Sequence, residues 1–184
     1  MVRSLTAGMM GIALVVAGCG DDDGGKSSEN LTASTEGGAT TSTLPAGGAG
    51  ECKLEGAANT TATEELVVHM NEWTIKPSAQ PKAGFVSIKA ENTGKENHEL
   101  VIVKSDTAAE ALPKDADGGM DEDKLPEGGL IGEIEPFAPA SVCKGVFNLP
   151  AGKYVLLCNI TETEPNGEKE SHFKEGMHVP LVVS

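Results

Sequence analysis

Beyond residue 50 the chain consists of short apolar runs separated by Gly, Pro and Asn. In several runs the apolar side chains alternate with period two, as in Val86, Ile88 and Ala90. This alternation is typical of strands with one buried face, and no segment carries a sustained helical stripe. We therefore predict an all-β domain over residues 51–184, a Greek-key antiparallel β-sandwich or barrel. The expected strands are 66–70, 85–90, 99–104, 141–149, 153–159 and 179–183.

One turn in this region supports the Greek-key topology. Residues 149–154 read Leu-Pro-Ala-Gly-Lys-Tyr, which looks like a tyrosine corner. In such a corner the tyrosine hydroxyl bonds back to nearby backbone. The alternative is a plain turn in which Tyr154 is simply buried. We expect the corner because Tyr154 leads directly into the segment that ends at Cys158.

A long acidic connection occupies residues 105–130. Its acids suggest a calcium loop, which needs an oxygen ligand at position five, Gly at six and Glu at twelve. Counted from Asp115, those positions hold Gly119, Met120 and Pro126. The pattern does not fit calcium, so we predict a solvated loop.

The first 50 residues have a different character. Residues 1–18 hold one Arg, an apolar stretch of about 12 residues and a small-residue cleavage site, which is the layout of a secretory signal. That stretch is too short to span a bilayer, which needs roughly 20 residues. The run Val-Ala-Gly-Cys at 16–19 resembles the bacterial lipobox, in which the cysteine is diacylated; the alternative is an ordinary signal cleaved nearby. We expect lipid on Cys19 to hold the exported protein at a membrane, facing the periplasm or the cell exterior.

Residues 19–50 are rich in Gly, Ser and Thr and have almost no large apolar side chain, so we predict a flexible linker reaching roughly 30 Å. Removal of residues 1–18 takes away Arg3, the only arginine, and leaves 13 lysines against 28 acids, a net charge of −15. Such a surface disfavours nucleic acid and anionic lipid, and a basic protein partner suits it better.

The chain has four cysteines, and lipid on one of them leaves an odd number for disulfides. Exported proteins commonly pair their cysteines. Lipid on Cys19 leaves three, so one must be free, metal-bound or paired between chains. Neither Cys52 nor Cys143 has a histidine nearby in the sequence, and we expect these two to pair; in the chain-entropy model the bridge adds on the order of 4 kcal/mol. Cys158 is then the leftover thiol.

Histidine and methionine accompany this thiol. His98, after an Asn, precedes an apolar run, and Cys158, His172 and Met177 follow one another in the last quarter of the chain. In this order of residues, over 64–184, the chain resembles the cupredoxins, especially small bacterial lipoproteins of cupredoxin type. The resemblance implies that these four residues bind one copper ion at the end of the sandwich. Two imidazoles and a thiolate with a weak axial thioether make a blue copper, or type 1, site.

Thirteen residues separate Cys158 from His172, whereas only a few lie there in the cupredoxins that the chain resembles. Lengthening a loop from about 3 to 13 residues costs only about 1.3 kcal/mol in closure entropy. Metal-binding energies are on the order of 10 kcal/mol, so we expect copper binding to survive. The acids of this insertion could supply an extra ligand, form a docking surface beside the copper, or belong to a tolerated surface insertion; they are Glu162, Glu164, Glu168 and Glu170.

The two other histidines have simpler interpretations. His69 lies in an expected strand, and we predict that it is exposed on the outer face or locally hydrogen-bonded. His178 directly follows Met177, so in an extended strand it points away from the methionine. We predict that it is a supporting or surface residue.

These residues favour a non-enzymatic, membrane-tethered electron carrier. Cys158 is the expected electronic path, the histidines fix the geometry, His172 offers its edge to a redox partner and Met177 tunes the potential. Two alternatives remain: a lipoprotein that captures or delivers copper without a redox role, and a metal-free interaction module. The chain has no His-x-His pairs for a trinuclear copper centre, no Gly-x-Ser-x-Gly elbow and no phosphate loop.

Overall fold

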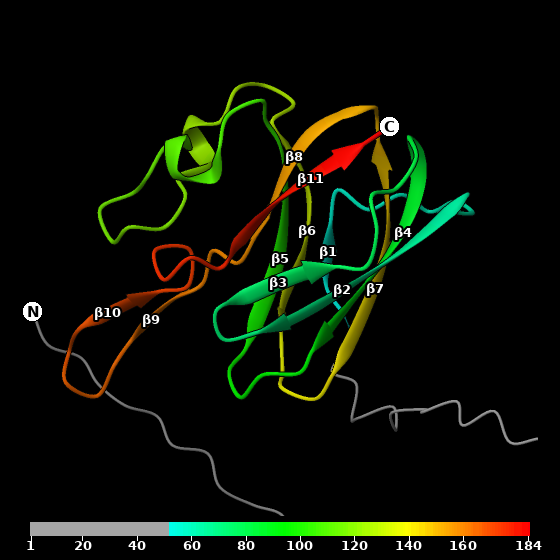
Figure 1. The fold of residues 1–184 in the computed structure, drawn as a ribbon. Coiled ribbons are helices and arrows are strands. Elements are labelled where there is room, and N and C mark those ends of the chain that lie inside the picture. Colours follow the sequence, from blue (N-terminus) through cyan, green and yellow to red (C-terminus); the bar gives the residue numbers. More distant parts are fainter. Residues whose placement is uncertain (1–51) are drawn as a thin grey trace, which may run out of the picture. The chain divides into compact units, whose positions relative to one another are not determined.

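A computed structural model describes residues 52–184 as two β-sheets packed face to face (Figure 1). The five-stranded sheet has the order β1 (Leu54–Glu55), β6 (Leu130–Phe137), β5 (His98–Lys104), β8 (Gly152–Leu157) and β11 (His178–Val183). The four-stranded sheet has the order β3 (Thr74–Pro77), β2 (Glu64–Asn71), β4 (Gly84–Asn92) and β7 (Val142–Leu149). The expected signal peptide, lipidated Cys19 and linker lie outside the described residues.

The strand order confirms the predicted Greek-key sandwich. Strands β5 and β6 pair antiparallel, β6 contacts β7 across the sandwich, and β8 returns to pair with β5. A fourth strand that returns beside the first is the mark of a Greek key. The prediction of purely antiparallel pairing needs one correction, because β2 and β4 pair parallel. They can do so because β3 and the segment after it carry the chain back before β4 begins.

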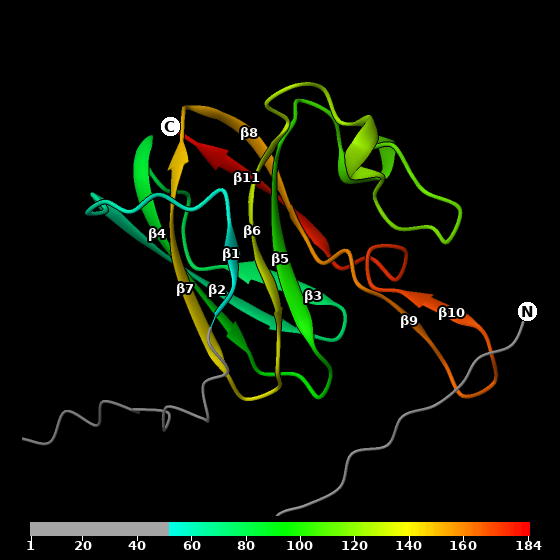
Figure 2. The ribbon, with the colours of Figure 1, turned by 180° about the vertical axis from the view of Figure 1, so that it is seen from behind.

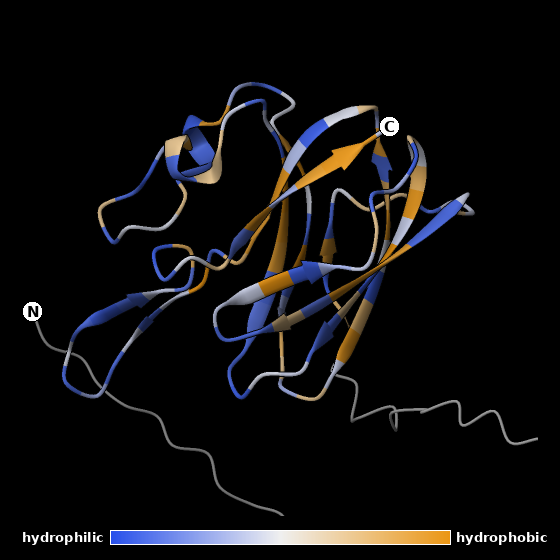
Figure 3. Cartoon of the chain, in the orientation of Figure 1, coloured by the Kyte–Doolittle hydropathy of each residue, from blue (hydrophilic) through white to orange (hydrophobic). Residues whose placement is uncertain are grey.

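The main core lies between the two sheets (Figure 3). In β2 the side chains of Leu66, Val68 and Met70 are fully buried, while His69 between them is exposed. This is the period-two alternation expected for a strand with one buried face. The Tyr154 hydroxyl donates to the Pro150 carbonyl at 2.5 Å, which confirms the tyrosine corner.

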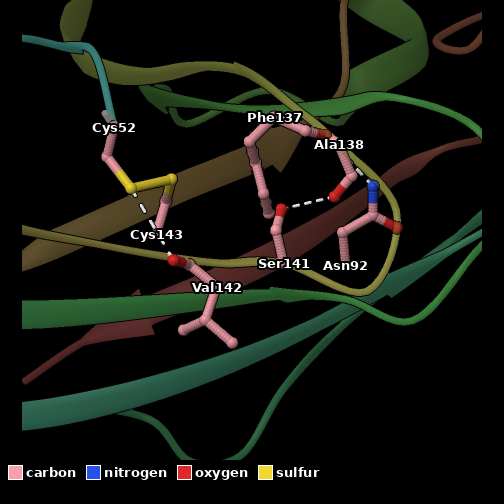
Figure 4. The surroundings of a disulfide bond; sticks show 7 residues. All are labelled: Cys52, Asn92, Phe137, Ala138, Ser141, Val142 and Cys143. Atoms are coloured by element: carbon pink, nitrogen blue, oxygen red, sulfur yellow. Dashed lines mark hydrogen bonds between the residues drawn. A yellow bond between two sulfur atoms is a disulfide. The ribbon is translucent and has the colours of Figure 1, made fainter. Parts of the chain in front are cut away.

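A disulfide joins Cys52, just before β1, to Cys143 in β7, which is the predicted pairing (Figure 4). Their Cα atoms are 5.6 Å apart, within the usual range for a disulfide. Nearby, the Ser141 hydroxyl donates to the Ala138 carbonyl in the turn before β7. A structural disulfide indicates an oxidising compartment.

Residues 105–130 are not the solvated loop that their acidity predicts. They contain two short 3₁₀ helices, η1 (Ala109–Ala111) and η2 (Glu122–Lys124), on the outer face of the five-stranded sheet (Figure 2). Leu112 and Met120 are buried there against Val101 and Leu157. The sequence prediction failed because these few apolar anchors have no regular spacing. Within residues 52–184 no helix is long and apolar enough to cross a membrane.

The thirteen residues between Cys158 and His172 form an extra hairpin of β9 (Thr161–Thr163) and β10 (Lys169–Ser171) that extends beyond the sandwich (Figure 1). Its turn is closed by two backbone hydrogen bonds of 2.8 Å between Glu164 and residues 167 and 168. The hairpin is largely hydrophilic (Figure 3). We refer to it as the β9–β10 hairpin.

Candidate metal centre

Three adjacent strands of the five-stranded sheet bring the predicted ligands to one end. His98 is the first residue of β5, and Cys158 directly follows the last residue of β8, which pairs with β5. Met177 directly precedes β11, which pairs with β8 on the other side. His172 directly follows β10. The antiparallel register of β5, β8 and β11 therefore places residues from distant parts of the sequence side by side.

Two imidazoles and one thiol meet in the interior at this end. The Cys158 Sγ lies 3.2 Å from Nδ1 of His172, and the two imidazole rings of His98 and His172 are 5.3 Å apart between centroids. One ligand atom from each of the three residues lies within 4.8 Å of the other two. All three side chains are fully buried. The structure thus brings together three of the four predicted ligands in positions where they could share one ion.

The hydrogen bonding around these side chains is incomplete in a way that fits a metal. Both ring nitrogens of His98 and Nε2 of His172 are buried and have no hydrogen-bond partner among the described residues. Buried polar atoms are almost always partnered, and leaving one unpartnered costs on the order of 1–3 kcal/mol. A metal ion would engage such imidazole nitrogens directly.

The protonation states also suit metal binding. Burial, and for His98 the neighbouring His172, lowers the pKa of both imidazoles, which keeps their nitrogens neutral and able to bind a metal. Burial raises the pKa of the Cys158 thiol to about 12, so without a metal it stays protonated. The Sγ already accepts a hydrogen bond from the Glu99 backbone N–H at 3.4 Å. A metal would displace the thiol proton and neutralise the buried thiolate.

Met177, the fourth predicted ligand, is fully buried beside this group. Its carbonyl accepts a hydrogen bond from the Cys158 N–H at 3.0 Å, and its own N–H donates to the His172 carbonyl at 2.9 Å. These two bonds close the turn between His172 and β11. The backbone thus holds Met177, Cys158 and His172 together.

A structured loop before β5 supports His98. The Glu72 carboxylate accepts hydrogen bonds from the backbone N–H groups of Lys95 at 2.5 Å and Glu96 at 2.9 Å, and lies 3.5 Å from His98 Nε2. Burial works to raise the pKa of Glu72, but these N–H bonds outweigh it and hold the pKa below its ordinary value. Gly94 packs so closely that a Cβ there would lie 2.9 Å from His98 Nε2. A side chain at position 94 would therefore crowd both the Glu72 carboxylate and the His98 ring.

The sequence analysis predicted that His172 offers an exposed edge to a partner, but the structure buries this side chain. Its side chain has no exposed surface, and the Trp73 ring stacks edge-on against it with centroids 4.8 Å apart. The prediction was wrong because Trp73 lies about 100 residues away in the sequence. Of the hairpin acids, Glu170 lies with Glu96 beside the His172 ring.

The remaining histidines lie where the sequence predicted. His69 is half exposed and its Nδ1 lies 2.9 Å from the Glu91 carboxylate on the neighbouring strand. His178 packs against the Phe173 ring at a centroid distance of 5.2 Å and lies 3.9 Å from Glu110. Neither belongs to the His98, Cys158 and His172 group.

Sequence reasoning missed the polar residues that surround the centre. Asn159, next to Cys158, holds the backbone of Met120 through its side-chain oxygen at 2.6 Å and its side-chain nitrogen at 2.9 Å. The Glu99 carboxylate accepts the Asn159 N–H at 2.9 Å, and burial raises the pKa of Glu99 to about 7. The position of Asn159 directly after the predicted ligand Cys158 was the one available signal.

No family model and no curated protein matches this sequence. Among solved structures, the chain is similar to auracyanin B, at 17% identity and a TM-score of 0.47, over 70% of this chain and 94% of that one. It is also similar to dithionite-reduced auracyanin from Roseiflexus castenholzii, at 20% identity and a TM-score of 0.45, over 68% and 99% of the two chains. Reduced rusticyanin matches at 16% identity and a TM-score of 0.43, over 68% and 82%. At these low identities and TM-scores, the similarity says nothing about the chemistry of this chain.

Proposed function

We propose that this protein binds one copper ion in a type 1 site and transfers single electrons outside the cytoplasm. The observation that carries the proposal is the buried group of His98, Cys158 and His172, in which both ring nitrogens of His98 lack a hydrogen-bond partner and Nδ1 of His172 faces the Cys158 sulfur. A thiolate and two imidazoles suit both Cu(I) and Cu(II), and this donor set with a weak axial thioether is that of blue copper sites. When bound, the ion supplies a one-electron Cu(II)/Cu(I) couple. An exported redox protein would give the electron and another would take it.

Each residue has a distinct part in this proposal. Cys158 provides the thiolate, and the strand β8 that carries it connects the site covalently to the sheet. His98 and His172 fix the geometry, with Glu72 behind His98 and Trp73 against His172. Met177, which is fully buried and bonded through its backbone to Cys158 and His172, would supply the thioether. Burial of the whole group limits rearrangement of ligands and water when the charge of the ion changes.

Two separate features support the proposed location. The disulfide between Cys52 and Cys143 fits an exported domain, because such bonds persist in oxidising compartments. The lipobox-like run at 16–19 supports a lipid anchor on Cys19, and the residues after it give a tether of roughly 30 Å. We propose that the tether lets the acidic domain search for a basic partner without leaving the membrane surface.

Voltammetry on the copper-loaded protein tests the electron-transfer role. We expect one reversible one-electron wave that is absent in His98→Gln and kept in the matched control His69→Gln, because His69 is exposed and lies outside the group. Absence of any wave in protein that holds one copper ion would contradict electron transfer.

One observation favours a second candidate, a protein that captures or delivers copper. His172 is covered, so no ligand ring is presented to a redox partner at the surface. Copper bound tightly but without a reversible wave, and passed to a copper-free acceptor protein, would support this candidate over the first.

A further inference from the structure

Acidic side chains gather on the side of His172 that faces away from Cys158. Glu96, in the loop before β5, and Glu170, on the β9–β10 hairpin, each offer a carboxylate oxygen within 4.8 Å of the other and of a His172 nitrogen. The Glu96 Oε2 is 3.7 Å from His172 Nε2. These residues come from two segments more than 70 positions apart in the sequence, so the hairpin completes the group.

The His172 ring has two nitrogens with different surroundings. Its Nδ1 lies 3.2 Å from Cys158 Sγ and belongs to the buried centre. Its Nε2 is buried, points toward the carboxylates and has no hydrogen-bond partner among the described residues. The Glu96 Oε2 is likewise buried and unpartnered. At 3.7 Å these two atoms are too far apart for a hydrogen bond. Both could instead donate electron pairs to a cation placed between them.

The charge around this gap is uncompensated. Glu72, Glu162 and Glu164 add further negative charge close to Glu96, Glu170 or both. Within residues 52–184 none of these five carboxylates forms an ion pair with a lysine. A cation at the gap would relieve both the repulsion and the lack of partners.

We propose that Glu96, Glu170 and Nε2 of His172 form an outer binding site for a divalent transition-metal ion. Two carboxylates and one imidazole are the donor set that Zn²⁺ and similar ions accept. Glu96 retains 39% of its side-chain exposure, so the site opens to solvent although the histidine is covered. This inference goes beyond the proposed copper site and does not require that copper fill it.

The shared ring couples the two sites. An ion on Nε2 leaves the ring proton on Nδ1, where it faces the Cys158 sulfur. An ion on Nδ1 leaves the proton on Nε2, where it faces Glu96. A neutral His172 ring can therefore bind an ion at only one of the two sites at a time. An ion in the outer site would be separated from the buried centre by the imidazole ring of His172.

Zinc titration calorimetry on the full chain carrying Cys158→Ser tests the outer site without the buried thiolate. We expect one Zn²⁺ per chain, with Kd raised at least tenfold by Glu96→Gln and by Glu170→Gln. The matched control is Glu168→Gln, which removes the same charge from the same hairpin but contacts Asn166 instead of the site. We expect it to change Kd less than threefold.

Three outcomes would overturn the outer site: no zinc binding, equal loss in the Glu168 control, or binding that survives both site variants and disappears with His98→Gln. The third would place the ion at the buried centre. If Glu96 only accepts a proton from His172, Glu170→Gln has no effect, which also contradicts the proposal.

Should Cys158→Ser fail to fold, Mn²⁺ titration followed by electron paramagnetic resonance gives the same comparison in the unaltered chain, because Mn²⁺ prefers carboxylates to thiolates. Absence of a copper thiolate band in the unaltered chain would refute the proposed function and leave this test standing.

Discussion

Two acidic segments lie beside the metal centre, and they are attached to the sandwich in opposite ways. Residues 105–130 bury Leu112 and Met120 against the outer face of the five-stranded sheet. The β9–β10 hairpin between Cys158 and His172 contributes no residue to that cluster, and only the partly buried Ile160 packs against the main core. The two segments are both acidic but have different roles. The first packs against the sheet through buried apolar side chains, whereas the second places the Glu170 carboxylate beside His172.

The largest expected effect is on the first segment. Met120→Ala removes a side chain that is only 2% exposed, and buried methionine truncations cost about 2–5 kcal/mol. We expect the free energy of unfolding, measured with urea, to fall within this range. A fall below about 1 kcal/mol would mean that the segment is not packed as described.

The next effect concerns the connection between that segment and the centre. Asn159→Ala removes two side-chain hydrogen bonds to the Met120 backbone and one to Glu122. Leaving these groups unpartnered costs about 1–3 kcal/mol. Because Asn159 follows Cys158, we also expect the copper–thiolate absorption band to shift. Asn166→Ala on the hairpin is the control, and it should change neither stability nor the band.

The strand β6, which follows the first segment, should also respond to pH. Burial, together with the charges of Glu122 and Glu99, raises the pKa of Glu133 in β6 to about 8. The folded state then binds a proton that the unfolded state has lost, so stability falls as pH rises from about 5 to 8. Glu133 is half exposed to the solvent, and we expect a loss on the order of 1 kcal/mol in the metal-free protein. Denaturation at several pH values should show a smaller slope in Glu133→Gln, and an equal slope would contradict this assignment.

The smallest effect on stability is expected at the hairpin. Glu164→Gln removes a partly exposed charge outside either core, and such surface changes usually stay within about 0.5 kcal/mol. Thermal unfolding should therefore be nearly unchanged. A clear destabilisation would show that the hairpin is as firmly attached as residues 105–130, and the contrast between the two segments would fail.

The fold was predictable where local pattern and burial agree. The runs that became β4, β5 and β8 are rich in Val, Ile and Leu, so their strands were expected at nearly the right positions. Strand β6 was missed because Gly132, Glu133 and Pro136 interrupt its apolar pattern. The β9–β10 hairpin was missed because its strands have three residues each and bury no apolar side chain that could leave a pattern.

The grouping of His98, Cys158 and His172 was predictable from the sequence, and the surroundings of this group were not. The order of His98, Cys158, His172 and Met177 along the chain is enough to suggest a copper site. Trp73 covers His172, and the Glu72 carboxylate lies behind His98. Only tertiary packing brings these two residues to the centre. Residues that act through a neighbour leave no spacing pattern, so one sequence cannot identify them.

Addition of Cu(II) to the full chain, followed by visible absorption, tests the central claim most directly. We expect an intense copper–thiolate charge-transfer band that saturates at one equivalent and is lost in Cys158→Ser. A protein that stays colourless, or that keeps the same band in Cys158→Ser, would contradict a copper site built on Cys158.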